Sequence, residues 1–209
     1  MKLYEFALSP NCQKVSALAR EVGVALDVVP IDLFRGGAKT PAMLAKNPNG
    51  KLPILEDDDY VLWESNAMLA YLAAKAGRAD LAPTQPRERA EVDRWMSWQT
   101  SHFSPAIRKV AFERVVKKLA GLGAPDEAVV RAGTEEFAVV ASVLEQSLGN
   151  KEHLCGRLTI ADFALTPSAA LTASSGLDLE PFPKVRAWLG RMTQRDSVKQ
   201  TLAAARGAA

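Results

Sequence analysis

The stretch "ALSPNCQKV" at residues 7–15 joins an apolar strand pattern to an apolar helix pattern. Ser9 is followed by Pro10, and Ser at an N-cap with Pro at the first helical position favours a helix start. The free amides and the dipole of a helix N-terminus also stabilise a thiolate beside them. We therefore expect Ser9 to cap a helix and to lie where thiol chemistry is favoured.

Strand and helix signals alternate around this stretch. "KLYEFAL" at 2–8 is short, apolar and β-prone, and the helix after it carries Cys12, Val15 and Leu18 on one face and ends at Gly23. "LDVVPIDL" at 26–33 indicates a second strand. A strand–helix–strand unit of this size is expected to be parallel and right-handed.

The next elements complete a small α/β domain. Residues 32–48 predict a Gly-containing loop with one short helix, and "LPILEDDDYVLWES" at 52–65 predicts an antiparallel hairpin around an Asp turn at 57–59. A helix is expected from Ser65 to about Ala76. The order βαβαββα over residues 1–77 predicts a four-stranded mixed sheet with helices on both faces.

The segment "GRADLAPTQP" at 77–86 contains Gly77, Pro83 and Pro86 and predicts a linker over 78–86. After it, apolar residues recur only at helical spacing, with a kink expected at Pro105. Further helices are expected at about 125–148, 159–174, 183–193 and 196–205. Residues 87–209 therefore predict an all-α domain.

Composition excludes several classes of function. The 209 residues carry 26 basic and 24 acidic side chains, a net charge of +2, which does not favour nucleic acid or an anionic membrane as a partner. The sequence contains no secretory signal and no run of about 20 apolar residues. Two cysteines, Cys12 and Cys155, and two distant histidines predict neither a disulfide framework nor a metal site. We expect a cytoplasmic protein.

Three motifs within the first domain resemble those of the cytosolic glutathione S-transferases: "SPNC" at 9–12, "NGKLP" at 49–53 and "WES" at 63–65. The likeness is to the serine-type classes, the plant-like phi group and its bacterial relatives, and it covers the whole chain. It implies a thioredoxin-like first domain, a helical second domain, a homodimer, and glutathione as co-substrate without a cofactor.

Pro53 opens an apolar strand, where a residue without an N–H is unusual. Only about 5–6% of X–Pro bonds are cis, which favours a trans bond here. The resemblance implies the opposite, a cis bond that turns the peptide groups of Leu52 outward to pair with the backbone of glutathione. We expect the cis form.

The pair Glu64–Ser65 opens a helix, where Ser65 serves as a cap or as part of an anion site. The resemblance implies that Ser65 binds the γ-glutamyl carboxylate of glutathione and that Glu64 binds its ammonium. It also implies that Lys39 and Lys51 contact the glycine carboxylate, although a surface lysine is ordinarily only solvated. Asn11 is expected within reach of the site.

The role of Ser9 follows from what the motif lacks. A redox relative has Cys-Pro-x-Cys, whereas this chain has Ser-Pro-Asn-Cys and cannot form a dithiol there. A free thiol has a pKa of about 8.5, and a Ser hydroxyl with a helix N-terminus needs to supply about 2–3 kcal/mol to lower it by two units. Ser9 is thus expected to donate a hydrogen bond to the glutathione thiolate. Cys12 is expected to be a buried, inert thiol, with a catalytic role as the alternative.

The helical domain contains a motif that indicates its fold, and it is expected to contribute to the binding site of the electrophile. "LTIADF" at 158–163 has capping-box spacing between Thr159 and Asp162, and His102 is expected to be packed or solvated rather than catalytic. The resemblance implies an apolar electrophile site. Its walls are expected from Pro10, Leu33, Phe34, Phe112 and Val116.

The sequence therefore predicts a glutathione transferase that activates the glutathione thiol and adds it to an apolar electrophile. Two alternatives stay open. One is a non-catalytic interaction protein with the same fold, and the other is a glutathione-dependent thiol–disulfide oxidoreductase or peroxidase. The absence of a first cysteine in the motif weakens the latter.

Overall fold

The computed structural model describes residues 1–207, which form two compact units. One unit contains residues 1–82 and the C-terminal stretch from Arg195, and the other contains residues 83–194. The division at 82/83 falls inside the expected linker at 78–86. Within residues 1–207, no helix is long and apolar enough to span a bilayer.

The first unit contains a four-stranded sheet in the order β2-β1-β3-β4. Its strands are β1 (Lys2–Glu5), β2 (Asp27–Pro30), β3 (Ile54–Asp57) and β4 (Tyr60–Leu62). β1 pairs with β2 in parallel and with β3 antiparallel, and β3 pairs antiparallel with β4. The mixed sheet predicted from the alternating pattern is therefore confirmed.

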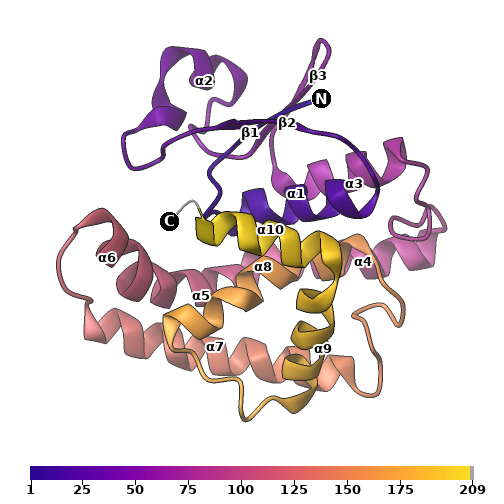
Figure 1. Cartoon of the computed structure of the whole chain (residues 1–209). Coiled ribbons are helices and arrows are strands. Elements are labelled where there is room, and N and C mark those ends of the chain that lie inside the picture. Colours follow the sequence, from indigo (N-terminus) through magenta and orange to yellow (C-terminus); the bar gives the residue numbers. More distant parts are fainter. Residues whose placement is uncertain (208–209) are drawn as a thin grey trace. The chain divides into compact units, whose positions relative to one another are not determined.

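Helices cover both faces of this sheet. Figure 1 shows α1 (Pro10–Glu21) and α3 (Ser65–Lys75) on one face and α2 (Pro41–Lys46), preceded by η1 (Gly37–Lys39), on the other. Leu3, Leu18 and Leu69, from β1, α1 and α3, are completely buried. One part of the core of this unit thus lies between the sheet and the pair α1 and α3, and Ala38 of η1 and Met43 of α2 are buried in a further cluster with residues of the sheet.

The last helix, α10 (Asp196–Gly207), belongs to the sheet-containing unit and packs against α1 (Figure 1). The sequence pattern had assigned this segment to the helical domain. At the end of α1, the carboxylate of Glu21 accepts hydrogen bonds from the Arg195 guanidinium and from the Ser197 hydroxyl, the latter at 2.6 Å. Since α1 is covered by α10 as well as by α3, every residue from Cys12 to Ala19 is buried.

The regular elements of the second unit, residues 83–194, are all helices, as expected. Pro86–Ala120 forms successive helical segments, of which η2 and η3 are π-helical turns. The helices of this unit are α4 (Pro86–Trp98), η2 (Gln99–Phe103), α5 (Ser104–Ala111), η3 (Phe112–Val116), α6 (Lys117–Ala120), α7 (Glu127–Leu148), α8 (Ile160–Ser175) and α9 (Pro183–Gln194). Pro105 lies in the first turn of α5, directly after the π-helical turn η2.

Asp162 organises the core of the helical unit. Its buried carboxylate accepts hydrogen bonds from the backbone N–H of Thr159 at 3.0 Å, the N–H of Leu154 at 3.1 Å and the indole N–H of Trp188 at 2.9 Å. Three donors offset the cost of burying a charge. The "LTIADF" motif is therefore a structural junction.

Candidate functional site

Ser9 lies between β1 and α1, at the N-cap of α1. Its N–H donates to the Phe6 carbonyl at 2.8 Å, and its own carbonyl accepts the N–H of Gln13 at 2.9 Å. The Ser9 hydroxyl makes no capping hydrogen bond, so the predicted cap role of this side chain is wrong. The hydroxyl instead interacts with the sulfur of Cys12. The hydroxyl is half-buried and not engaged by the helix amides, and the protonated thiol of Cys12 can donate to its oxygen, which leaves the single hydroxyl proton for a ligand.

Cys12 is completely buried on the first turns of α1. Burial raises the pKa of its thiol to about 12, although hydrogen bonds from the Phe6 N–H, at 3.4 Å, and from Ser9 act in the opposite direction. At neutral pH the group is a protonated thiol, which is a poor nucleophile. The expectation of a buried cysteine is confirmed, and the raised pKa supports the prediction that its thiol is inert.

The loop after β2 places an aromatic side chain near Ser9. The ring of Phe34 meets the ring of Phe6 edge-on, with 5.3 Å between centroids, and the Phe6 carbonyl holds the Ser9 N–H. The Asp32 carboxylate accepts the N–H of Phe34 at 2.9 Å and fixes the turn. Leu33 and Phe34 are exposed. Phe34 therefore adds exposed apolar surface next to Phe6, and Pro10 directly follows Ser9.

The Leu52–Pro53 peptide bond is cis, as the resemblance predicted. Leu52 lies outside the sheet ladder, because β3 begins at Ile54. The side chain of Asn47 holds the preceding loop by donating to the Lys51 carbonyl at 2.8 Å and by accepting the Asn49 N–H at 3.1 Å. Sequence analysis missed Asn47, although the "NPNG" turn that it opens was a usable signal.

The two lysines expected at the glycine end of glutathione lie close in space. A Cβ placed on Gly50 would be 3.4 Å from Cγ of Lys39, so the stem of Lys39 passes beside the loop that carries Lys51. Both side chains are exposed. The observation places the stem of Lys39 beside the loop of Lys51, and the contact of both with the glycine carboxylate stays a prediction. Asn11 is exposed on the first turn of α1, close in sequence to Ser9.

Helix α3 begins at Ser65, as predicted, but its cap residue differs from the one considered. Glu64, not Ser65, occupies the N-cap, with φ of 73°. A positive φ is uncommon for a residue with a side chain, and such positions are enriched at functional sites. Ser65 is the first helical residue and is buried, whereas Glu64 is exposed. Their neighbour Asn66 accepts a hydrogen bond at 2.6 Å from Lys14, a buried cation that sequence analysis did not identify.

The remaining expected residues lie in the helical unit. Phe112, which is exposed, and Val116, which is half-buried, are both part of the π-helical turn η3. A π-helical turn is a frequent feature of functional sites. His102 is exposed in η2.

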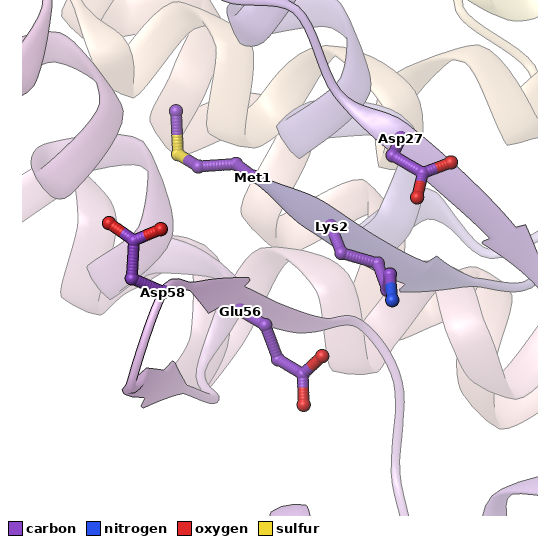
Figure 2. Close-up of a pocket in the computed structure, with 5 residues that line it drawn as sticks. All are labelled: Met1, Lys2, Asp27, Glu56 and Asp58. Atoms are coloured by element: carbon purple, nitrogen blue, oxygen red, sulfur yellow. The ribbon is translucent and has the colours of Figure 1, made fainter.

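A shallow pocket lies at the other end of the sheet from Ser9. Figure 2 shows its lining residues, Met1, Lys2, Asp27, Glu56 and Asp58. These residues mark the start of β1 and the end of β3, whereas Ser9 follows β1 and Pro53 precedes β3. Glu56 is engaged by Lys46 and by the Tyr4 hydroxyl. Within residues 1–207, no group of three or more His, Cys, Asp or Glu side chains could hold a metal ion.

Comparison with known proteins places this arrangement in a family. The profile described as "Glutathione S-transferase, N-terminal domain" matches residues 3–83, and that described as "Glutathione S-transferase, C-terminal domain" matches residues 101–196. Glutathione S-transferase 3 of Zea mays is 36% identical over 211 residues, which cover 98% of this chain and 94% of the relative.

Solved structures agree with this assignment. Glutathione transferase F7 from Populus trichocarpa matches with a TM-score of 0.88 and 30% identity over 97% of each chain. Glutathione S-transferase-I bound with lactoylglutathione matches with a TM-score of 0.89 and 29% identity, over 97% of this chain and 98% of that one. The chain thus belongs to the glutathione S-transferase family.

Proposed function

We propose that this chain conjugates glutathione to an apolar electrophile and that Ser9 activates the glutathione thiol. The observation that carries the proposal is the Ser9 hydroxyl, which is half-buried at the start of α1 and makes no capping bond. A hydroxyl there, beside the positive end of a helix dipole, stabilises a bound thiolate as a hydrogen-bond donor.

Glutathione binds along the features that surround Ser9. Ser65 and the N-terminal amides of α3 receive the γ-glutamyl carboxylate, and Glu64 pairs with the γ-glutamyl ammonium. The peptide groups of Leu52, before the cis bond to Pro53, pair with the backbone of the cysteinyl residue. A relative of the same fold is bound with lactoylglutathione, which supports a glutathione-shaped site in this fold.

The remaining contacts extend the site at both ends. Lys39 and Lys51 receive the glycine carboxylate of glutathione, and Asn11 contributes from the first turn of α1. The electrophile binds over the apolar surface beside Ser9. Its walls in this unit are proposed to be Pro10, Leu33 and Phe34, and the roles of Phe112 and Val116 stay predictions.

For this reaction the protein mainly has to lower the pKa of the glutathione thiol by electrostatic stabilisation of the thiolate. A thiol with a pKa of about 8.5 is only a few per cent ionised at pH 7, and lowering its pKa by two units makes it mostly thiolate. The shift corresponds to about 2–3 kcal/mol, which one charge-assisted hydrogen bond and a helix N-terminus supply together. The thiolate then attacks the electrophile directly, and Ser9 keeps its proton.

The two alternatives are less favoured. A thiol–disulfide oxidoreductase needs a reactive cysteine at the site, and the thiol of Cys12 is buried with a raised pKa of about 12. A non-catalytic protein has no need to keep Ser9, Glu64 and Ser65 together. A homodimer remains a prediction, and sedimentation at micromolar concentration tests it, since a species of only 22.6 kDa would exclude it.

The decisive experiment compares the wild type with Ser9→Ala and Ser9→Thr. With glutathione and a chromogenic aryl halide, Ser9→Ala should lower kcat by about 100-fold, and Ser9→Thr should retain part of the activity because it keeps a hydroxyl. Thiolate absorbance of the bound glutathione, followed against pH, should show its pKa rising in Ser9→Ala. Unchanged kcat and unchanged thiol pKa in Ser9→Ala would assign Ser9 no role in activation.

A further inference from the structure

We propose that Lys14 is a positioning residue of the glutathione site, whose buried ammonium holds the first turn of α3 and couples proton binding to the binding of the γ-glutamyl carboxylate. The inference rests on the proposed function and adds a residue to it. It makes the affinity for glutathione depend on pH through a group that does not touch the ligand.

The position of Lys14 is the first argument. The residue lies on the second turn of α1 and is only 1% exposed, which is rare for a lysine. Its Nζ donates to Oδ1 of Asn66 at 2.6 Å. Asn66 directly follows Ser65 in the first turn of α3. The ammonium therefore connects the helix that follows Ser9 to the helix turn that is proposed to bind the carboxylate.

The electrostatics of the cluster is the second argument. The pKa of Lys14 is lowered to about 7, and burial is the main cause. Two neighbours act in the opposite direction: the carboxylate of Glu64, at the N-cap of α3, and to a smaller extent Cys12 of α1 itself. Cys12 does not titrate near neutrality, since its pKa is raised to about 12. Of the other elements against α1, β1 contributes Glu5, which accepts from the Ser16 hydroxyl at 2.6 Å. The stretch before α10 contributes Arg195, which pairs with Glu21.

Linkage gives the sign of the effect. A carboxylate bound at Ser65 adds a negative charge near Lys14, so it favours the protonated ammonium and raises the pKa of Lys14 above 7. Reciprocally, the protonated ammonium favours the bound carboxylate. Affinity is therefore highest below pH 7 and falls as the pH rises through the pKa values of the free and bound forms. A rise of one pKa unit on binding makes the ligand bind about tenfold weaker once Lys14 is neutral.

The test uses S-methylglutathione, whose sulfur cannot ionise, and calorimetric titrations between pH 6 and pH 8.5. Wild type should lose affinity by about five- to tenfold over this range. Lys14→Met should bind with the weaker affinity at every pH, because it has no charge to lose. Lys14→Arg should keep the tighter affinity throughout, since a guanidinium stays protonated. Turnover should show the same loss as an increase in KM for glutathione, with kcat nearly unchanged.

The matched control is Arg20→Met, which removes one positive charge from an exposed position on the same helix. It should keep the wild-type slope, and titration of the ligand's own groups cancels in this comparison. Where a Lys14 variant fails to fold, NMR of 13C-labelled lysine in the wild type measures the pKa of Lys14 directly, with and without S-methylglutathione. Binding of S-methylglutathione should raise the pKa of Lys14.

The outcomes separate the two proposals. Failure to bind S-methylglutathione at any pH overturns the glutathione site and this inference together. Binding with the same pH slope in wild type, Lys14→Met and Arg20→Met overturns the role of Lys14 alone. An NMR pKa of Lys14 that does not move on binding does the same.

Discussion

The first turns of α1 and α3 offer the same backbone feature, a helix N-terminus with unsatisfied amides, and they differ in the side chains around it. At α1, a hydroxyl and a buried neutral thiol surround the helix start, and the pKa of Cys12 is raised to about 12. At α3, Glu64 stands at the N-cap and the ammonium of Lys14 lies beneath the first turn.

This difference suits two different anions. A thiolate is soft and reactive, so its binding position needs a donor that does not itself react, which a serine hydroxyl provides. A carboxylate with an adjacent ammonium is a permanent zwitterion, and it needs fixed charges of both signs. The comparison therefore supports the proposal that the start of α1 activates the thiol and the start of α3 recognises the γ-glutamyl group.

The largest expected effect comes from Ser9→Cys, which replaces the unreactive donor at α1 by a reactive one. The new thiol, at a helix N-terminus, should have a lowered pKa and attack the disulfide of glutathione disulfide. A new bond joins the protein sulfur to one glutathione sulfur, and the other leaves as glutathione thiolate. Conjugation should fall by about 100-fold or more, because the hydroxyl donor is lost.

Mass spectrometry after incubation with glutathione disulfide measures this change as the addition of one glutathionyl group. Cys12 should carry none, because it is buried. Wild-type conjugation rates in Ser9→Cys, with no glutathionyl adduct, would contradict the proposal that the start of α1 activates the glutathione thiol.

The next effect is expected from Ser65→Ala, which weakens recognition at α3 and leaves α1 intact. One hydrogen bond to a carboxylate contributes about 1.5–3 kcal/mol, so KM for glutathione should rise by at least about tenfold. The value of kcat should change little, since the lost contact is made equally in the ground state and the transition state. Steady-state kinetics at varied glutathione checks the split. A loss confined to kcat would place Ser65 in the wrong role.

The smallest effect on activity is expected from Cys12→Ala. The thiol is buried and neutral, so its removal should cost about 1 kcal/mol of stability through lost packing and leave kcat within about twofold. Thermal unfolding and turnover measure the two quantities. In the wild type, iodoacetamide at pH 8 should modify Cys12 much more slowly than a free thiol, since its pKa is about 12. Rapid modification of Cys12 with loss of activity would instead make it the catalytic residue.

Much of the fold could be predicted because its signals are local. The parallel unit, the hairpin and the helix starts after Ser9 and Glu64 each follow from spacing within a few residues. The cis bond at Pro53 could not be deduced from local preference, which favours trans, and came from the resemblance. The side-chain details were less accessible. The Ser9 hydroxyl interacts with the sulfur of Cys12, three residues further on, rather than with the helix amides, and spacing alone does not choose between these two local partners.

The burial of Lys14 shows why part of the candidate site could not be predicted from the sequence. Helical periodicity gives α1 one apolar face, and Lys14 lies off that face, where a solvated lysine is the ordinary expectation. In the structure α1 packs against α3 and also against α10, which begins 175 residues after the end of α1. The sequence pattern of α10 does not indicate that it packs against α1. A long-range contact of this kind cannot be predicted from local sequence patterns.

The place of α10 also bears on how the protein is made. Because the unit built on β1 and α1 includes the stretch from Arg195 onward, its first and last pieces leave the ribosome at opposite ends of synthesis. The nascent chain up to residue 82 has nothing yet to cover the flank of α1 against which α10 packs. The structure therefore implies that the unit built on β1 and α1 is completed only after the helical unit has been translated.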